Sequence, residues 1–262
     1  MFDINNFVID RIVRGVALSQ KDDSVLFSIN QIQNASLNCA SESTDAVDAM
    51  GTPIATFYRA KSCEFSAENA LFDMNLMATQ LGTSKKVASA ASKVVAPAME
   101  SFVAEGGKYV LKHAPKAAPA EIYAINGDST FGVKYVKETS VSDTAFAYVD
   151  ADHSITLPTG IDDGTEMFVM YEYETENAVE VVNSAKNFPV GCKFVMEVLG
   201  CDVCDQTNLV YAYVIFNNAK LSPDFDWSIA TDGTHPFSMK AQQDYCDKEK
   251  KLFSIIIPGD EE

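Results

Sequence analysis

The first 65 residues alternate between apolar and polar positions, which predicts β-strands. Residues 10–18 and 24–29 form two such runs. Residues 32–40 and 54–61 continue the pattern as a hairpin, with the polar segment 41–53 as its turn. Small polar and apolar residues mix on both faces of this hairpin, which favours strands exposed to solvent or to a partner.

A change to helical spacing marks the next stretch, which begins near Ser66. Apolar residues recur three and four positions apart before Gly82, at Leu71, Met74, Met77, Ala78 and Leu81. The same spacing returns after Gly82 and is interrupted by Pro97, at Val87, Ala91, Val94, Val95, Ala98 and Phe102. We expect a helical segment over about residues 67–105, as two short helices or as one interrupted helix.

A proline-bearing segment at 113–119 separates this stretch from a second set of β-like runs, and we expect a domain boundary there. The dipeptide Asn126-Gly127 predicts a tight hairpin. Further short strands are expected at even intervals, at 121–125, 130–136, 145–149, 154–157 and 166–173. This spacing predicts a small inserted β domain at 119–175, either immunoglobulin-like or a barrel.

The strand pattern returns near the C-terminus, with runs at 193–199, 209–216, 225–230, 237–241 and 252–257. We expect these strands to pair with the N-terminal ones, because one set of strands then flanks both ends of the insertion. The core is therefore expected to be discontinuous, comprising residues 1–118 and 176–262. The predicted fold class is mainly β with a helical segment (α+β), as a β-sandwich or barrel that carries the small β domain.

Charge is the unusual bulk property of the chain. The 262 residues include 37 Asp and Glu against 20 Lys and Arg, a formal net charge of -17. Such a surface repels phosphate, so tight nucleic-acid binding is not expected. The N-terminus lacks a secretory pattern, and no apolar run approaches the roughly 20 residues of a membrane span, so no membrane partner is expected. The six cysteines are expected to be reduced thiols.

A possible metal site involves Cys201 and Cys204, which form a Cys-x-x-Cys pair, with Cys192 and Cys246 as additional thiols. Zinc is held by four nitrogen or sulfur ligands, so these four cysteines are candidate zinc ligands. A zinc-finger signal would include a second closely spaced pair, which the chain lacks. Buried or turn thiols are the favoured interpretation, and no metal or cofactor is expected.

Catalytic signals are sparse in this sequence. The three histidines, His113, His153 and His235, lie in no recognisable nucleophile context, and no phosphate-binding loop, dinucleotide motif or Gly-x-Ser-x-Gly sequence is present. Acidic loops at 150–152 and 162–166 offer carboxylates to calcium, but neither completes an EF-hand pattern. We therefore expect a structural or assembly protein and not an enzyme.

A family resemblance rests on three stretches taken together: residues 45–54 leading into 59–65, residues 215–221, and residues 235–241, the last continuing to a β-like end at 251–257. In style and order these stretches resemble tailed-bacteriophage virion proteins, and tail tube proteins most of all. The resemblance covers about residues 1–110 and 185–258, which leaves the central β unit as a candidate decoration domain.

That resemblance implies a tail-tube-like β-sandwich or barrel flanked by a helix, in which six copies form a ring and the rings stack into a hollow tube. The hairpin at 32–61 would then pair with neighbouring copies and line the lumen. Its candidate assembly and lumen residues are Asn34, Ser36, Asn38, Asp45, Asp48, Thr56, Tyr58 and Lys61. A negative lumen would repel the phosphates of genomic DNA, which could then pass without tight binding.

The resemblance also implies the partners and the location of the protein. The partners would be further copies of the same chain and other virion tail or neck proteins, in the virion tail, after assembly in the cytoplasm of the bacterial host. Two alternatives remain open. One is a capsid decoration, neck or other virion binding module, in which residues 119–175 contact the partner, and the other is a metal-dependent enzyme built around Cys201 and Cys204.

Overall fold

The computed structural model describes residues 6–245 and 248–259. It divides the chain into two compact units, which are treated separately below. Unit 1 comprises Met1–Lys85 and Val181–Glu262, and unit 2 comprises Lys86–Glu180. The boundaries lie at residues 85/86 and 180/181, so the inserted unit is larger than the 119–175 domain that the sequence predicts.

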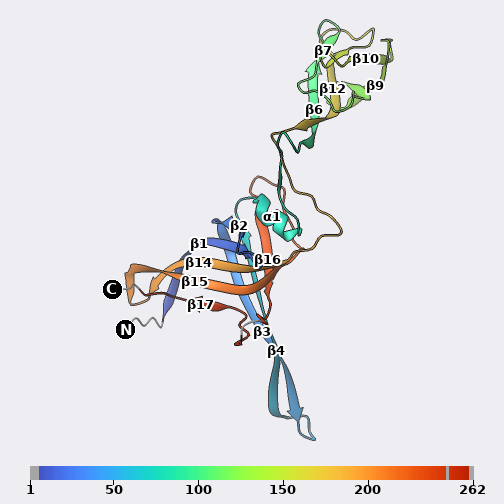
Figure 1. Cartoon of the computed structure of the whole chain (residues 1–262). Helices are drawn as coiled ribbons and strands as arrows, with labels where there is room; N and C mark the ends of the chain where they lie inside the picture. Colours follow the sequence, from blue (N-terminus) through green and yellow to red (C-terminus); the bar gives the residue numbers. More distant parts are fainter. Residues whose placement is uncertain (1–5, 246–247, 260–262) are drawn as a thin grey trace. The chain divides into compact units, whose positions relative to one another are not determined.

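Unit 1 is built on one eight-stranded antiparallel sheet with the order β2-β1-β14-β15-β16-β4-β3 and with β17 beside β15 (Figure 1). N-terminal strands pair with C-terminal ones, as expected from the sequence: β1 with β14, and β4 with β16. The strands are β1 (Phe7–Ser19), β2 (Val25–Ile29), β3 (Ile32–Val47), β4 (Pro53–Asn69), β14 (Gly191–Asp202), β15 (Asp205–Leu221), β16 (His235–Ala241) and β17 (Ser254–Ile256).

The sheet of unit 1 curls around a core of aromatic side chains. Phe65 on β4 lies 5.8 Å from Phe194 on β14, measured between ring centroids. In a flat sheet these strands, separated by β15 and β16, would be roughly 14 Å apart. The accumulated strand twist therefore brings the two halves of the sheet face to face, and the enclosed core includes Phe27, Phe65, Phe194, Phe216, Phe237 and Met239.

The single helix of the described chain, α1 (Met74–Gln80), belongs to unit 1. Asp73 caps its N-terminus by accepting hydrogen bonds from the backbone N–H groups of Asn75 and Leu76, at 2.9 and 2.7 Å. Gly82 follows the helix at φ +66°, where a Cβ atom would lie 2.3 Å from the backbone of Phe188. The mainly β fold with a helical element, predicted from the sequence, is thereby confirmed.

A buried histidine anchors α1 to the sheet. His235 is fully buried, and its Nε2 lies 2.8 Å from Oε1 of Gln80 on the helix. Its Nδ1 accepts a hydrogen bond from the backbone N–H of Asp73 at 3.3 Å, which requires an unprotonated Nδ1. Burial lowers the pKa of His235, and the negative charge of Asp73 opposes part of that effect. The folded state therefore holds this side chain neutral.

The stability of unit 1 is expected to fall as the pH drops below about 6.5, the ordinary pKa of an unfolded histidine. Below that value the unfolded chain binds a proton at His235 before the folded chain does, so the stabilisation present at higher pH is lost toward the depressed folded-state pKa. Trp227, the one tryptophan of the sequence, stacks on Phe72 beside His235 and reports this transition by fluorescence.

Urea unfolding at a series of pH values measures the effect. His235→Gln should flatten the slope of unfolding free energy against pH below about 6.5. His153→Gln, in unit 2, is the matched control and should leave that slope unchanged. Equal slopes for the wild type and His235→Gln would contradict the assignment.

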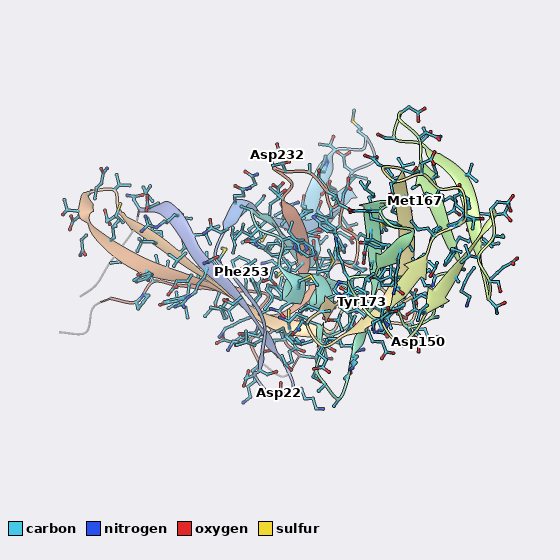
Figure 2. All side chains as sticks on the ribbon, turned by 90° about the horizontal axis from the view of Figure 1, so that it is seen from above. Asp22, Asp150, Met167, Tyr173, Asp232 and Phe253 are labelled. Atoms are coloured by element: carbon cyan, nitrogen blue, oxygen red, sulfur yellow. The ribbon has the colours of Figure 1, made fainter. Side chains whose placement is uncertain are left out.

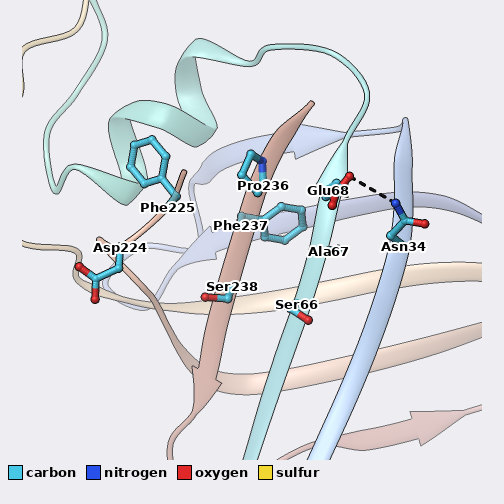
Figure 3. A pocket seen from close by; sticks show the side chains of 9 residues that line it. All are labelled: Asn34, Ser66, Ala67, Glu68, Asp224, Phe225, Pro236, Phe237 and Ser238. Atoms are coloured by element: carbon cyan, nitrogen blue, oxygen red, sulfur yellow. Dashed lines mark hydrogen bonds between the residues drawn. The ribbon is translucent and has the colours of Figure 1, made fainter. Parts of the chain in front are cut away.

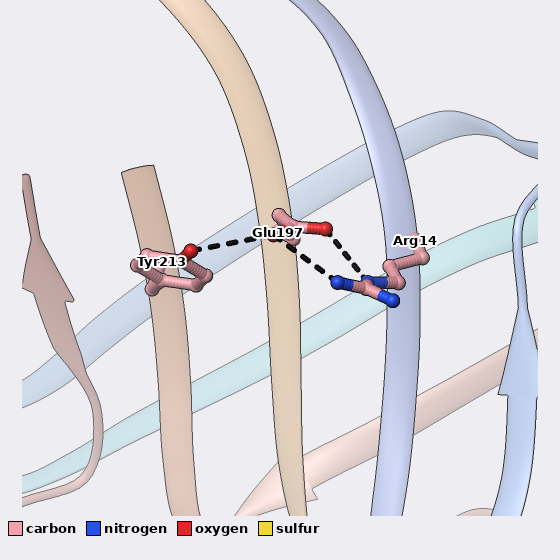
Figure 4. Close-up of polar contacts among 3 residues, drawn as sticks. All are labelled: Arg14, Glu197 and Tyr213. Carbon is pink, nitrogen blue, oxygen red and sulfur yellow. Dashed lines mark hydrogen bonds and ion pairs between the residues drawn. The ribbon is translucent and has the colours of Figure 1, made fainter. Parts of the chain in front are cut away.

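A polar ladder crosses three strands of unit 1 (Figure 4). Nε of Arg14 donates to Oε2 of Glu197 at 2.7 Å, and the hydroxyl of Tyr213 donates to Oε1 of the same carboxylate at 3.3 Å. The three residues are register partners on β1, β14 and β15. The largely buried carboxylate thus has partners on both sides, which fixes the register of the three central strands.

Unit 2 has a seven-stranded sheet with the order β6-β12-β8-β9-β10-β11-β7. The hairpin predicted at Asn126-Gly127 is present and joins β8 to β9. Met167 is fully buried in the core of this unit, whereas Asp150 lies in an exposed turn (Figure 2). The strands are β6 (Val94–Val103), β7 (Lys108–Val110), β8 (Glu121–Ile125), β9 (Phe131–Glu138), β10 (Ala145–Val149), β11 (Ser154–Thr156) and β12 (Glu166–Thr175).

The helix prediction for the second half of the segment 67–105 is wrong, because residues 94–103 form strand β6. Its side chains alternate in burial, with Ala98, Glu100 and Phe102 buried on one face. The apolar residues of this segment fit both a helical spacing and the period of two of a strand. The segment is a strand because it pairs with β12 along the whole length of β12. Pro97 is tolerated because β6 lies at an edge of the sheet.

The expected boundary at 113–119 lies inside unit 2. The backbone N–H of His113 donates to the hydroxyl of Tyr171 at 3.0 Å, and the ring of His113 stacks on Tyr173. The buried carboxylate of Glu100 accepts hydrogen bonds from the hydroxyls of Tyr109 and Tyr171. Burial and the hydrogen bond to Glu100 raise the pKa of Tyr109 to about 12, so this network is structural at neutral pH.

The strand predicted at 225–230 is also wrong, since these residues are irregular. They supply Trp227, whose ring lies 4.4 Å from that of Phe72. The apolar residues that predicted a strand here belong to a loop, in which Trp227 packs against Phe72. No helix in the described residues is long and apolar enough to cross a membrane.

Candidate functional site

The most exposed element of unit 1 is a two-stranded ribbon formed by β3 and β4 (Figure 1). Pairing between β4 and β16 ends at Cys63 and Ala241, so within the described part of the chain residues 40–62, the free ribbon, pair only with each other. The eight strand residues from Ala40 to Val47 extend for about 26 Å. An isolated two-stranded ribbon is at best marginally stable in water, so a partner is the expected source of its stability.

Asp48 closes the ribbon at its turn. Its Oδ1 accepts hydrogen bonds from the backbone N–H groups of Met50 and Thr52, at 2.8 and 2.9 Å. Gly51 follows at φ +85°, which suits glycine. Strands β3 and β4 continue to this turn, so the polar turn predicted at 41–53 is shorter than expected, covering only the residues between Val47 and Pro53.

The cross-strand register gives the free ribbon two different faces. Asp45 pairs with Thr56, whose hydroxyl donates to Oδ1 of Asp45 at 2.7 Å. Side chains alternate across a strand, so the polar face comprises Ser43, Asp45, Thr56 and Tyr58. The opposite face, called the apolar face, comprises Thr44, Ala46, Ala55 and Phe57 near the turn, and the charged pair Glu42 and Arg59 follows on it nearer the sheet. Tyr58 is 73% exposed and Phe57 is 55% exposed, so both faces are open in the single chain.

The candidate residues divide between the free ribbon and its base. Asp45, Thr56 and Tyr58 lie together on the polar face, whereas Asp48 serves the turn. Lys61 pairs with Ser41, below a bulge that places Ala60 at φ +48°. The other three candidates lie on the part of β3 that belongs to the sheet: Asn34, Ser36 and Asn38.

A shallow cavity of about 210 Å³ lies beside the start of β3 and the end of β4 (Figure 3). Asn34 Nδ2 donates to Oε2 of Glu68 at 3.3 Å there, and the hydroxyl of Thr234 donates to the same oxygen at 3.1 Å. Ligand pockets usually enclose about 300–1,000 Å³, so this cavity is small for a substrate. Asn34 and Glu68 therefore stabilise the local strand pairing.

A second exposed extension was not predicted from the sequence. The strands β14 and β15 continue beyond the predicted runs to a turn at Val203 and Cys204, with β1 beside them. Large apolar side chains are exposed on this extension, at Val8, Ile9, Val203, Leu209 and Tyr211. The period-two order of Thr207, Leu209 and Tyr211 was an available signal, which continues the alternation of the predicted strand toward its N-terminus.

The three candidate zinc ligands that the structure describes, Cys192, Cys201 and Cys204, are not gathered in one site. Cys192 and Cys201 lie on the same strand nine positions apart, which corresponds to roughly 30 Å. Cys204 is exposed in the turn, and Cys246 lies outside the described residues. Among residues 6–245 and 248–259 there is no group of three or more His, Cys, Asp or Glu side chains placed to hold a metal ion.

The acidic loops of unit 2 have local roles. Oδ2 of Asp152 accepts a hydrogen bond from Nζ of Lys108 at 2.7 Å, and Oδ1 accepts one from the hydroxyl of Ser154. These contacts lower the pKa of Asp152 to about 2, with the Lys108 contact as the largest cause. Asp163 accepts a hydrogen bond from the backbone of Gly106. Each of these two carboxylates thus tightens a turn.

A curled antiparallel sheet with long exposed strand extensions is characteristic of β-structured subunits that associate through their strands. Comparison with known proteins identifies the family. The sequence matches the YomU/Tube protein family over residues 7–254, so the chain belongs to this family and is a phage tail tube-like structural protein of the virion tail. No curated protein sequence matches the chain.

Proposed function

We propose that this chain assembles into rings that stack to form the phage tail tube, and that the free ribbon joins neighbouring subunits. The main support for this proposal is that residues 40–62 pair only with each other among the residues that the structure describes. Each edge of the free ribbon therefore presents backbone N–H and C=O groups that await a partner strand. Pairing of β3 in one copy with β4 in the next leaves the same edges open for further copies.

Such pairing is heterologous, because two different edges meet at each interface. It forms a closed ring when a whole number of copies, each rotated by the same angle, completes 360°. Each copy then contributes two strands to a continuous inner barrel. The family resemblance supports six copies per ring. Other tail and neck proteins would contact the ends of the stacked rings, after assembly in the cytoplasm of the bacterial host.

The two faces of the free ribbon differ in polarity, which supports an assignment of one face to the lumen of the tube and the other to the surrounding subunits. The polar face, with Asp45, Thr56 and Tyr58, would line the lumen, and the apolar face around Phe57 would pack against the surrounding subunits. Ser36 and Asn38, on the part of β3 that belongs to the sheet, and Lys61, at the start of the free ribbon, would continue the tube wall. Because the chain carries a net charge of -17, the lumen would repel DNA phosphates and let the genome slide.

Electron microscopy and sedimentation of the purified protein test this proposal. Negative-stain images should show rings or tubes with a central channel, and class averages should show six-fold symmetry. A monodisperse monomer at high concentration, also in the presence of other tail proteins, would contradict assembly. Rings of another symmetry would overturn only the hexamer.

Unit 2 is proposed to be a decoration that assembly does not need. Its two ends meet, since β5 (Lys86–Val87) pairs antiparallel with β13 (Val179–Glu180). Register partners in an antiparallel pair lie about 5 Å apart, so Lys85 and Val181 are at most roughly 13 Å apart. A linker of about four Gly and Ser residues can therefore replace unit 2.

A chain with that linker in place of Lys86–Glu180 is expected to form tubes with the same channel as the full chain. Trp227 fluorescence verifies that unit 1 remains folded. If unit 1 folds but no longer assembles, unit 2 belongs to the tube wall. The second candidate function, a virion binding module, assigns unit 2 the contact with a partner, and the deleted chain would then assemble but lose that partner.

A further inference from the structure

Two cysteines face each other at the base of the free ribbon. Cys39 on β3 and Cys63 on β4 are register partners, and their Sγ atoms lie 2.6 Å apart. Register partners in antiparallel strands have Cα atoms about 4.5–5.5 Å apart, which is within the range of about 4.4–6.8 Å that disulfides require. The backbone therefore needs no movement to accept a covalent bond between these sulfurs.

We propose that Cys39 and Cys63 form an intrachain disulfide through exchange with a small anionic disulfide of the oxidised glutathione class. Cys39 is exposed, and Cys63 is buried behind it. Both line a cavity of about 910 Å³, which is large enough for a molecule of this kind. Lys61, Lys250 and Glu249 line the same cavity. Nζ of Lys251 lies 2.7 Å from Oε2 of Glu249 and offsets its charge, so the two lysines complement the carboxylates of such an oxidant.

The exchange balances without any other reactant. The Cys39 thiolate attacks one sulfur of the small disulfide, which breaks that S–S bond, forms a mixed disulfide and releases one small thiolate. The Cys63 thiolate then attacks Sγ of Cys39 and releases the second small thiolate. Two protein thiols are oxidised, one small disulfide is reduced to two thiols, and the two protons from the cysteines pass to the released thiolates.

The two thiols differ in a way that sets the order of these steps. Burial raises the pKa of the Cys63 thiol to about 11, and the hydrogen bond with Cys39 adds to the effect. Cys63 therefore remains protonated near neutral pH, which slows its attack on the mixed disulfide. Its contact with Cys39 offsets this effect, because the attacking sulfur is already next to its target. Exchange should accelerate as the pH rises, because the thiolate is the attacking species.

The position of the pair gives the bond a mechanical consequence. Cys63 pairs with Ala241 at the last position where β16 supports β4. A disulfide at this position would hold the ribbon together at the point where it leaves the sheet, and separation of β3 from β4 would be blocked. This bond requires one chain only, so it does not depend on the proposed assembly into rings.

Peptide mapping of the full chain tests the bond directly. Arg59 and Lys61 lie between the two cysteines, so trypsin places Cys39 in the peptide 22–59 and Cys63 in the peptide 62–85. After treatment with oxidised glutathione at mildly alkaline pH, alkylation and digestion without reductant, these two peptides should appear as one linked species. Cys204→Ser is the matched control, because Cys204 is an exposed thiol in another turn, and it should leave the linked species unchanged.

Three outcomes would overturn the proposal: full alkylation of both cysteines after oxidation, a persistent glutathione adduct on Cys39, or a link between the Cys39 residues of two copies. Cys39→Ser must abolish the linked species. Hydrogen exchange supplies the second measurement, and oxidation should slow amide exchange across residues 40–62 about tenfold. An unchanged exchange rate in the oxidised protein would contradict the claim that the disulfide prevents separation of β3 from β4.

Discussion

Replacement of residues 42–60 by Asn-Gly is expected to abolish assembly while unit 1 stays folded. Ser41 and Lys61 are register partners, so a two-residue Asn-Gly turn can close the hairpin between them. Among the described residues, the removed segment pairs only with itself in the sheet, and it contributes no side chain to the aromatic core. The free energy of unfolding of unit 1 should therefore change by about 1 kcal/mol or less.

Sedimentation velocity and Trp227 fluorescence together check this result. The shortened chain should sediment as a monomer at concentrations where the wild type forms rings, with an unchanged unfolding midpoint. A matched control keeps the ribbon length and exchanges Asp48 for Asn, which preserves an acceptor for the turn. Rings formed by the shortened chain would show that another surface, such as the β14–β15 extension, joins the subunits.

Phe65→Ala should destabilise unit 1 by about 3–5 kcal/mol, the usual range for removal of a buried phenylalanine. Phe65 is 2% exposed, and its ring contacts those of Phe194, Phe216 and Phe237 at centroid distances of 5.8 to 6.0 Å. It thus connects strands from both halves of the curled sheet. For a unit of this size the melting temperature should fall by roughly 10 °C.

Phe57→Ala on the same strand is the control that separates folding from assembly. Phe57 lies on the apolar face of the free ribbon and is 55% exposed, so its removal should change the unfolding free energy by no more than about 0.5 kcal/mol. The same change should weaken ring formation if that face packs against neighbouring subunits. Thermal unfolding and sedimentation measure the two effects, and a stable, fully assembling Phe57→Ala would argue against that packing.

The sheet of unit 1 could be predicted from the sequence because its strands contact a core. Cys192, Phe194 and Met196 are buried and alternate with the half-buried Lys193 and Val195, so burial follows a period of two at the start of β14. The free ribbon has no core behind it, and the polar run near Ser41 therefore predicted a turn where strands continue. The role in assembly that we propose for the ribbon came from the resemblance, and not from the residues alone.

Other features depend on pairing that periodicity cannot show. The segment 94–103 satisfies two periods, and only the pairing with β12 selects the strand. The faces of the free ribbon depend on its register and on the bulge at Ala60. Likewise, Cys39 and Cys63 are 24 positions apart, and only the hairpin register brings them into contact.

The meeting of β5 and β13 also has a consequence for evolution and for engineering. A domain whose two ends lie about 5 Å apart can be exchanged for unit 2 without altering the path of unit 1. The gene can therefore acquire, lose or replace the segment between Lys85 and Val181 as a cassette. In an assembled particle each copy of the chain would present one such cassette, so the number of displayed domains would equal the number of subunits.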